Sequence, residues 1–243
     1  MQMIESVHNP KVKEWVKLQQ KKYRQQNQQF IVEGEHLVEE ALKAGVVQAV
    51  VTTRTSFSTD APVYVVNEAV LAKLAMTPTH QDIMAICDMV AVAPTQLKRV
   101  LLLDAIQDPG NLGTLIRSAL AFAVDAVVLG KGTVDVYNEK VLRSTQGAIF
   151  HLPVIQADLQ MYIPELQAQG IEVIGTSLHH AVDLQSLEGP ECWALLLGNE
   201  GQGVQQSLLD LTDENIFIEM SSAAESLNVA VAGSIALYQL SVK

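Results

Sequence analysis

Several residues able to do chemistry gather in one segment, which runs from Asp108-Pro109-Gly110-Asn111 to Arg117. The segment directly follows an apolar run at residues 100–103 and leads into a helical pattern at 118–122. A buried strand, a Gly/Pro loop and a helix entry are therefore predicted in that order. Asp, Asn and Arg placed together in such a loop are unfavourable unless they find polar partners. We interpret the segment as part of a ligand site.

Two more loops of this kind follow. The first, residues 198–203, has glycines at 198, 201 and 203 after the apolar run 195–197, and the second covers residues 221–228. Glycines at this spacing predict close approach of the backbone to a planar or anionic ligand, although a structural turn also explains them. The order G-x-x-G-x-G is not the dinucleotide-binding fingerprint, and no Gly-Lys-Ser/Thr of a P-loop occurs.

Single residues in these loops have structural as well as functional explanations. Glu200, between two glycines, either stabilises a helix entrance or binds Arg117 across the site. Ser226 is predicted to cap the last helix. Asn228 is expected inside the first turn of that helix, where Asn is a weak helix former, so a ligand or loop contact is favoured.

The second half of the chain alternates between strands and helices. Strands are predicted at 100–103, 126–129, 171–175, 193–197 and 216–220, and helices at 112–122, 138–148, 159–169, 205–211 and 226–240. Strands that are apolar on both faces predict a mostly parallel sheet covered on both sides. Ligands of such sheets bind beyond the carboxyl ends of the strands, where the three loops fall.

The first half predicts a smaller α/β unit over residues 1–93. Helices are expected at 11–20, 35–44 and 67–76, with Gly45 ending the second, and short strands at 30–32, 46–52, 63–66 and 83–86. The stretch 93–98 is polar and contains Pro94, so it is the most plausible linker.

Composition narrows the class of protein. With 243 residues, 49% of them hydrophobic, the chain can form one large domain or two ordinary ones around a sizeable core. No apolar run approaches the roughly 20 residues that cross a bilayer, and residues 1–22 lack the apolar part of a secretory signal. Cys87 and Cys192 are far apart, and His179-His180 has no carboxylate at ligand spacing. A cytoplasmic protein without disulfide, metal or membrane contact is predicted.

The net charge of −11 argues against nucleic acid as a partner, but the charge is unevenly distributed. Residues 1–30 carry six basic and two acidic side chains, a local charge of +4. Phosphate binding depends on local counterion release, so these residues are candidates for it, although a solvated amphipathic helix explains them as well. The candidates are Lys11, Lys13, Lys21, Lys22 and Arg24, with Arg143 from 140–144 left open between a surface residue and a substrate contact.

With these motifs in order, the chain resembles the SpoU (TrmH-type) class of the SPOUT superfamily of RNA methyltransferases. The three family motifs correspond to residues 108–117 with Ala121-Phe122, residues 197–204, and residues 218–232 with Leu237-Tyr238. Residues 141–153 also resemble the family, and Phe30-Ile31-Val32-Glu33-Gly34 resembles the ribosomal-protein-like substrate-binding domain often fused in front. The match extends over nearly the whole chain.

The resemblance implies an α/β fold with two domains. Residues 1–96 would be a smaller α/β domain that binds the RNA substrate. Residues 97–243 would be the methyltransferase domain, a mostly parallel sheet with helices on both faces and a C-terminal trefoil knot. Periodicity alone does not suggest a knot, because knots are nearly absent among folds. The resemblance also implies a homodimer formed through the C-terminal domain.

The resemblance further implies S-adenosylmethionine as the cofactor, with no metal. Gly198, Ile218 and Leu227 would bind it, with Leu197, Met220 and Thr176 as weaker candidates. The reaction would be methyl transfer to a ribose 2′-hydroxyl in RNA, with ribosomal RNA (23S in particular) favoured over transfer RNA. The catalytic set would be Arg117, Asn111, Glu200, Ser226 and Asn228. Because a guanidinium stays protonated, we expect Arg117 to stabilise the developing alkoxide or a phosphate, oriented by Glu200 and Asn111.

Three positions depart from the family pattern, which usually has Gly at 123, Pro at 219 and Gly at 222. This chain has Ala123, Glu219 and Ser222. Loss of Gly from a cofactor loop restricts its backbone, which keeps a second hypothesis open: an RNA-binding or ribosome-assembly protein of the same fold without turnover. A transfer-RNA 2′-O-methyltransferase is a further alternative. A nucleotide-dependent enzyme of ordinary doubly wound fold is disfavoured by the incomplete fingerprint.

Overall fold

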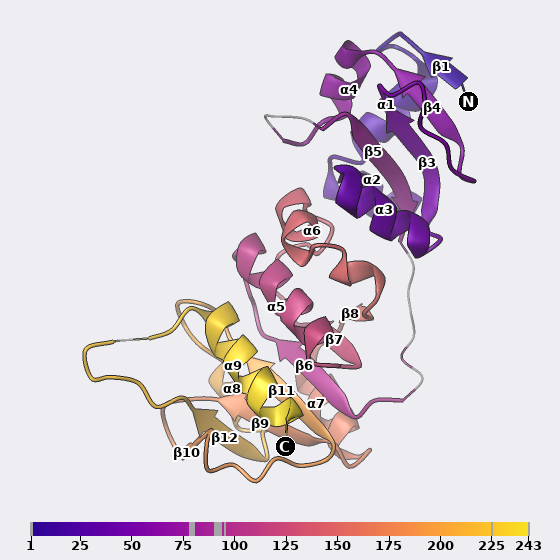
Figure 1. The fold of residues 1–243 in the computed structure, drawn as a ribbon. Helices are drawn as coiled ribbons and strands as arrows, with labels where there is room; N and C mark the ends of the chain where they lie inside the picture. The colour runs from indigo at the N-terminus through magenta and orange to yellow at the C-terminus, as the bar shows by residue number, and fades with distance from the viewer. Residues whose placement is uncertain (1, 78–80, 90–93, 95, 225, 243) are drawn as a thin grey trace. The chain divides into compact units, whose positions relative to one another are not determined.

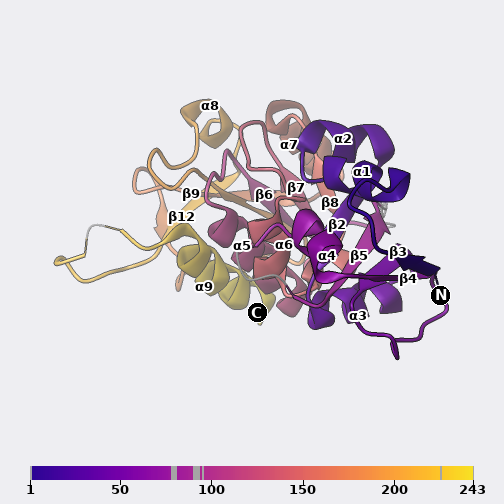
Figure 2. The same ribbon diagram turned by 90° about the horizontal axis from the view of Figure 1, so that it is seen from above.

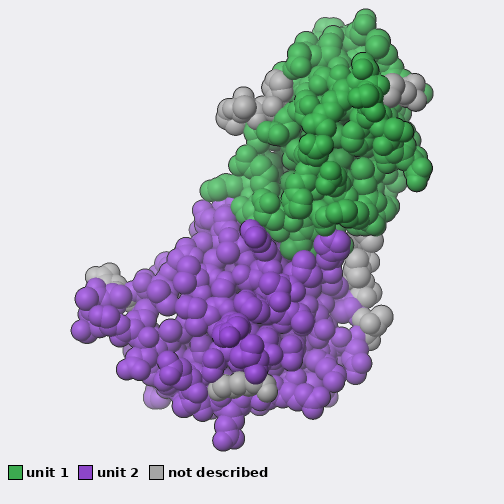
Figure 3. All heavy atoms as spheres, in the orientation of Figure 1, with its two compact units in different colours: residues 1–90, 137–150 green, residues 91–136, 151–243 purple. Residues whose placement is uncertain are grey.

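The computed structural model describes residues 2–77, 81–89, 94, 96–224 and 226–242. The chain divides into two compact units, coloured separately in Figure 3. Unit 1 comprises residues 1–90 and 137–150, and unit 2 comprises residues 91–136 and 151–243. Ala93 and Thr95 of the predicted linker lie outside the described residues, and the domain boundary at 96/97 stays a prediction.

Unit 1 contains a five-stranded mixed sheet, with four helices from the first part of the chain and one from residues 137–150. The strands are β1 (Gln2–Ile4), β2 (Gln29–Glu33), β3 (Val47–Thr52), β4 (Val63–Val66) and β5 (Ile83–Asp88). The helices are α1 (Pro10–Lys17), α2 (Lys21–Asn27), α3 (Glu35–Lys43), α4 (Glu68–Leu74) and α6 (Glu139–Thr145), which a 3-10 turn (Ala148–Phe150) follows. The strand order is β1-β4-β3-β5-β2, in which β5 is antiparallel to both of its neighbours.

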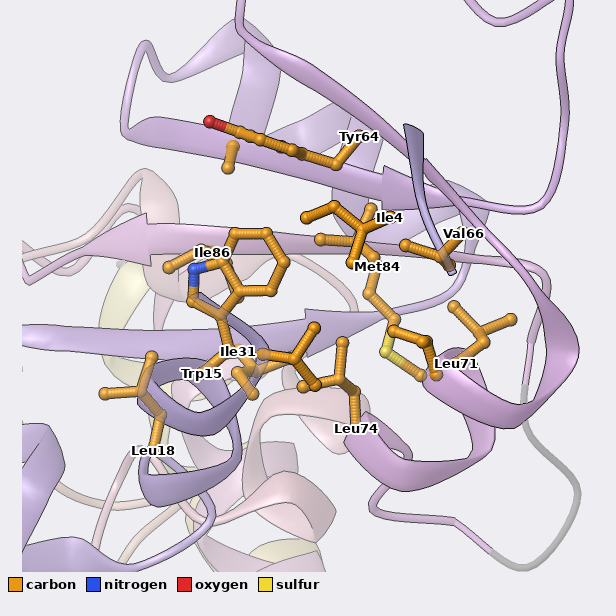
Figure 4. Close-up of a cluster of buried hydrophobic side chains, with 14 residues drawn as sticks. Ile4, Trp15, Leu18, Ile31, Tyr64, Val66, Leu71, Leu74, Met84 and Ile86 are labelled. Carbon is orange, nitrogen blue, oxygen red and sulfur yellow. The ribbon is translucent and has the colours of Figure 1, made fainter. Parts of the chain in front are cut away.

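Alternating apolar residues place a core on each face of this sheet. Figure 4 shows the first core, where Trp15 and Leu18 of the α1 segment and Leu71 and Leu74 of α4 pack against strand residues such as Ile31. The neighbours of Ile31 in β2, Phe30 and Val32, point the other way and pack with α3 and α6. Helices therefore cover both faces, as a strand that is apolar on both sides requires.

Unit 2 is built on a seven-stranded sheet whose neighbouring strands are all parallel. The strands are β6 (Arg99–Leu103), β7 (Ala126–Leu129), β8 (Val154–Gln156), β9 (Glu172–Thr176), β10 (Val182–Asp183), β11 (Trp193–Leu197) and β12 (Glu214–Phe217), in the order β10-β12-β9-β11-β6-β7-β8. Its helices are α5 (Pro109–Ala121), α7 (Leu159–Gln167), α8 (Gln206–Leu209) and α9 (Val229–Ser241). The predicted parallel sheet is confirmed.

Helices cover both faces of this sheet too. Leu102, Ala194 and Leu196 pack with α7 and α8 on one face. On the other face α5 and α9 lie side by side, as Figures 1 and 2 show. Gly233 of α9 allows this approach, because a Cβ there would lie 2.5 Å from Leu197 Cδ1 and 2.6 Å from Leu115 Cδ2.

Several predicted bounds are wrong. The expected helix 11–20 ends at Lys17, and a separate helix, α2, follows it. β12 ends at Phe217 instead of residue 220. The last helix begins at Val229, and its cap is Asn228 instead of Ser226, because the Asn228 carboxamide accepts from the backbone N–H groups of Ala230 and Val231. None of the helices built from the described residues is long and apolar enough to cross a membrane.

Candidate active site

The carboxylate of Glu200 joins the loop after β11 to the loop before α5. Its Oε1 accepts from the backbone N–H of Asp108 at 3.0 Å and from Asn111 Nδ2 at 3.0 Å. Its Oε2 accepts from the backbone N–H of Gln107 at 3.2 Å. The backbone donors immediately precede α5, where a negative charge is favourable. Glu200 is therefore a clamp between two of the three predicted loops.

Asn111 extends this connection to the third loop. Asn228 Nδ2 donates to Asn111 Oδ1 at 2.9 Å, while Asn228 Oδ1 caps α9 through the N–H groups of Ala230 and Val231 at 2.9 and 3.3 Å. Each carboxamide uses its oxygen and its nitrogen at once. A chain of hydrogen bonds thus runs from Glu200 through Asn111 to Asn228, and it links segments that are far apart in the sequence.

The hydrogen bonds stabilise the ionised form of Glu200. Burial by itself would raise the pKa of this carboxyl group. The bond from Asn111 and the backbone N–H groups of Glu200, Asp108 and Gln107 outweigh burial and lower the pKa below its usual value. Glu200 is consequently an anion at neutral pH.

The loop that carries Glu200 is closed on itself. Asn199 and Gly203 exchange two backbone hydrogen bonds, at 3.0 and 2.9 Å, and Gly203 has a φ of 71°. Asn199 Oδ1 accepts from the N–H groups of Gly201 and Gln202, and its Nδ2 donates to the carbonyl of Ala105 at 2.8 Å. A Cβ on Gly198 would overlap the backbone of Gly203 and Val204. Only glycine fits position 198.

Two residues that hold these loops were not among the predicted site residues. One is Asn199, just described. The other is Asp104, which is 2% exposed and accepts from the Gln205 backbone N–H at 2.8 Å and from Gln205 Nε2 at 2.6 Å. The sequence signal for Asp104 was available: it is a charged residue directly after the buried run 100–103.

A pocket of about 570 Å³ opens beyond the carboxyl ends of β9, β11 and β12, within unit 2. Its volume lies in the usual range for small-molecule sites. Residues 199–203 of the loop after β11 line it, as do Ala232 and Ala236 of α9. Leu227, although 38% exposed, contributes an apolar side chain to the lining. The lining of the pocket is therefore mixed, with apolar side chains beside polar residues of the loops.

The predicted cofactor residues divide into two groups. Thr176, Ile218, Leu227 and Met220 line the pocket. Gly198 and Leu197 are buried behind it, where Gly198 permits the closed loop and Leu197 packs beneath α9. Among the predicted catalytic residues, Glu200 and Ser226 line the pocket, whereas Asn111 and Asn228 stand behind Glu200 in the hydrogen-bond chain. Glu225, in the same loop as Ser226, lies outside the described residues.

Arg117 does not join this cluster. It is exposed, and it forms no hydrogen bond or ion pair with any residue in the described part of the chain. The expected pairing with Glu200 is therefore wrong within one chain. Arg117 is six residues beyond Asn111, which places it about 9 Å further along the helix and about 120° around it. Its side chain belongs to the solvent face of α5.

The exposed face of α9 is apolar. Val231, Ile235, Tyr238 and Val242 recur at intervals of four, three and four residues and are 41–60% exposed. Leu120, on the same exposed face of α5 as Arg117, is 36% exposed. We call these five side chains the apolar stripe.

The residues predicted to bind RNA lie in unit 1, and one of them has a structural role. Lys11, Lys13, Lys21 and Lys22 are exposed, and Arg143 is half-exposed and lies 3.5 Å from Glu139. Arg24 is only 7% exposed, and its Nη1 donates to the carbonyls of Leu18 and Gln19, both at 3.0 Å. The RNA contact predicted for Arg24 is corrected accordingly: its guanidinium caps the end of α1.

The departures from the family pattern have different consequences. Ala123 adopts a φ of 52°, the left-handed region that favours glycine, so the usual Gly at this position has a backbone reason. Ser222 is not among the described residues with positive φ, so its side chain adds no such strain. Glu219 is exposed.

No group of three or more His, Cys, Asp or Glu side chains among the described residues is arranged to hold a metal ion.

Two parts of the chain match known protein families. Residues 98–238 match the SpoU rRNA Methylase family, and residues 9–85 match the MRM3-like substrate binding domain. The chain is 46% identical to the 23S rRNA (guanosine(2553)-2′-O)-methyltransferase RlmP of Bacillus subtilis, over 99% of both chains.

Two solved structures resemble the chain over nearly their whole length. The AdoMet-bound rRNA methyltransferase from Sinorhizobium meliloti is 29% identical with a TM-score of 0.88, and the match covers 98% of this chain and 97% of that one. AviRb from Streptomyces viridochromogenes, a SpoU methyltransferase in complex with AdoMet, shares the fold with a TM-score of 0.86 at 24% identity, over 97% and 98% of the two chains.

Proposed function

Since the chain belongs to the SpoU rRNA methylase family and is an RNA 2′-O-methyltransferase, we propose that its substrate is 23S ribosomal RNA and its methyl donor S-adenosylmethionine. The observation that carries the proposal is the pocket whose edge Glu200 ties to the loops around Asn111 and Asn228. The full-length likeness to an enzyme that modifies guanosine 2553 of 23S rRNA favours the same nucleotide here.

The pocket fits the proposed methyl donor in size and chemistry. Its volume of about 570 Å³ suits a ligand with an adenosine and an amino-acid part. Ile218, Leu227 and Met220 offer apolar contacts to a purine, and the backbone of the loop 199–203 offers polar groups. Gly198 and Leu197 support these walls from behind, while Thr176 lies at the end of β9.

The chemistry divides between donor and protein. The sulfonium of S-adenosylmethionine supplies an already activated methyl group. The protein must hold a ribose 2′-oxygen in line with the methyl group, so that the new O–C bond forms as the S–C bond breaks, and it must stabilise the charge that develops as the hydroxyl proton passes to solvent water. Glu200 and Asn111 keep the loops in register, and Ser226, which lines the pocket, would contact the RNA or the donor.

Arg117 is proposed to supply the positive charge. A guanidinium remains protonated at neutral pH, so it stabilises an alkoxide or a neighbouring phosphate better than it removes a proton. The Arg117→Ala variant should lose most of its kcat and keep its affinity for S-adenosylmethionine, measured by tritiated-methyl transfer and by calorimetry. Retained turnover would exclude Arg117 from the mechanism.

The apolar stripe supports a homodimer. Five exposed apolar side chains on neighbouring helices form a surface that a second copy can cover by two-fold symmetry. Arg117 precedes Leu120 of the stripe by one helical turn, and α9 also lines the pocket through Ala232 and Ala236. Dimerisation would therefore bring the guanidinium of one copy towards the pocket of the other.

The dimer can be tested directly by light scattering. Ile235→Asp places a charge in the middle of the apolar stripe and should give a monomer of about 26.5 kDa. Gln202 is exposed and lies outside the stripe, so the control variant Gln202→Asp should leave the dimer intact. A wild-type protein that is monomeric at micromolar concentration would contradict the proposal.

Unit 1 is proposed to hold the RNA. Its exposed lysines Lys11, Lys13, Lys21 and Lys22 lie in a region of local charge +4, and the MRM3-like match covers the same residues. The functional boundary at residues 96/97, the trefoil knot and the cytoplasmic location remain predictions.

The proposal is tested by mapping modified nucleosides. Ribosomal RNA from a strain lacking the gene should have lost one 2′-O-methylated nucleotide of 23S rRNA that the parent strain has. Loss of a 2′-O-methyl group from transfer RNA instead would identify transfer RNA as the substrate. No change in either RNA would favour a binding protein without turnover.

A further inference from the structure

We propose that a pocket between α1, α2 and β2 binds an unpaired nucleobase of the RNA, with the ring of Tyr23 as the surface on which the base stacks. The inference rests on the proposed function, because it presupposes an RNA substrate. It goes beyond that function by assigning one nucleotide-binding subsite in unit 1, apart from the methyl-transfer pocket.

The pocket has the size and lining that a base requires. Its volume is about 490 Å³. Polar side chains dominate the lining, and two aromatic residues belong to it. The lining residues are Glu14, Trp15, Lys17, Leu18, Tyr23, Gln26, Asn27 and Gln29.

Tyr23 lies outside the hydrophobic clusters described above for unit 1. One of these clusters contains Trp15 and another contains Phe30, and neither contains Tyr23. Trp15, by contrast, is 7% exposed and packs edge-on against Tyr64 in the core, with ring centroids 5.2 Å apart (Figure 4). Tyr23 is half-buried and faces the pocket. An aromatic side chain that is neither in the core nor fully exposed is suited to stacking on a ligand.

Two lysines flank the ring and supply the charge that a nucleotide phosphate needs. Lys17 Nζ lies 5.6 Å from the Tyr23 ring centroid and Lys22 Nζ lies 5.8 Å from it. Neither lysine forms an ion pair with another residue in the part of the chain that the structure describes. Such contacts at an exposed ring are weak, so a base can take the ring face while an ammonium moves to the phosphate.

The rest of the lining offers hydrogen bonds to the edge of a base. The carboxamides of Gln26 and Asn27 form no hydrogen bond with any described residue, so donors and acceptors on both remain available. Glu14 adds an acceptor, which suits a base edge that carries N–H groups. An aromatic ring, unused amides and cations together describe a site for a nucleotide of a loop or bulge, since a base inside a duplex cannot be reached in this way.

The site is formed before RNA arrives. Arg24 Nη1 binds the carbonyls of Leu18 and Gln19, which fixes α2 against the end of α1. Gln28 ends α2 in the left-handed conformation, with a φ of 53°, and Gln29 Nε2 donates to Asp88 Oδ1 at 3.0 Å. Helix α2, which carries Tyr23, is therefore held at both ends, and little ordering opposes binding.

The experiment measures the affinity of the full-length protein for protein-free 23S rRNA by filter binding, at several salt concentrations. Tyr23→Ala should weaken binding about tenfold, with an unchanged slope of log Kd against log salt, because the ring is uncharged. Tyr23→Leu keeps the apolar bulk but not the ring, and it should bind RNA as weakly as Tyr23→Ala. Tyr23→Phe and Tyr23→Trp should bind as tightly as the wild type.

Lys17→Gln is the matched control for charge, and it should reduce the salt slope by about 0.7–0.9. Affinity for S-adenosylmethionine should be unchanged in all five variants. Equal RNA affinity of Tyr23→Ala, Tyr23→Leu and the wild type would overturn the stacking proposal. A loss of RNA affinity in Tyr23→Phe equal to that in Tyr23→Ala would also overturn it.

The test separates this proposal from the proposed function. Methyl transfer to 23S rRNA by the wild type, combined with wild-type RNA affinity in Tyr23→Ala, would refute the pocket and leave the function standing. Ring-dependent binding without any methyl transfer would support the pocket and refute the function. A wild type that does not bind 23S rRNA would overturn both, and the calorimetric affinity for S-adenosylmethionine would then show whether donor binding survives.

Discussion

Replacing Glu200 by Gln should destabilise unit 2 in a way that depends on pH. The carboxylate accepts three hydrogen bonds, from Gln107 N, Asp108 N and Asn111 Nδ2. A carboxamide has one acceptor oxygen, so at least one of these donors loses its acceptor and faces an N–H group instead. Glu200 is exposed, so solvent screening reduces the effect of its charge. We expect a loss of about 1–2 kcal/mol at pH 7, or a Tm lower by about 2–8 °C.

The pH dependence distinguishes charge from packing. Because the pKa of Glu200 is lowered by folding, its contribution is complete above the usual value of about 4.3 and is lost as the pH falls through the lower, folded value. The Tm difference between wild type and Glu200→Gln should be constant from pH 8 to about 5. At lower pH it should decrease towards zero.

The matched control is Glu219→Gln, which should leave the Tm unchanged. The Glu219 carboxylate is exposed and forms no hydrogen bond or ion pair with any described residue. A Glu200→Gln difference that is absent, or that persists unchanged in acid, would refute the assignment of Glu200 as an ionised clamp.

Three further predictions concern the backbone and the subunit arrangement. Gly198→Ala forces a Cβ into the backbone of Gly203, so calorimetry should find affinity for S-adenosylmethionine lost at least tenfold and unfolding easier by about 1–3 kcal/mol; unchanged affinity would contradict the close approach. Ala123→Gly relieves a φ of 52° and should raise the free energy of unfolding, measured by urea denaturation, by about 1 kcal/mol, whereas Ala121→Gly, at the last residue of α5, should lower it. An equimolar, refolded mixture of Arg117→Ala and Gly198→Ala chains should regain about a quarter of wild-type methyl transfer, since half the dimers then contain one complete site; no recovery would place Arg117 in the site of its own chain.

The convergence of the three loops could be predicted from the sequence, because parallel strands end at one edge of a sheet. Asn111, Glu200 and Asn228 all follow such strand ends, and the structure brings them together. Which atoms pair could not be predicted. Arg117 and Asn111 are on the same helix, but a difference of about 120° in helical phase decides that only Asn111 reaches Glu200.

Other details depend on tertiary contacts that the local pattern does not encode. Ser226 and Asn228 are both good capping residues, and only the direction in which the loop enters α9 selects Asn228. Arg24 looks like one more cation of a basic segment, yet it is buried because the end of α1 needs donors for its carbonyl groups. The grouping of residues 137–150 with unit 1 follows from the packing of Leu142 against the β2 side of that core, which has no signature in the sequence.

One measurement tests the central claim most directly. The purified protein is incubated with unmodified 23S rRNA and S-adenosylmethionine that carries a trideuterated methyl group, and the nucleosides are analysed by mass spectrometry. The label should appear in a single 2′-O-methylated nucleoside, a guanosine, and its ribose fragment should carry the added mass. Label on a base, or none in RNA although calorimetry shows that the donor binds, would contradict ribose methylation as the function of this protein.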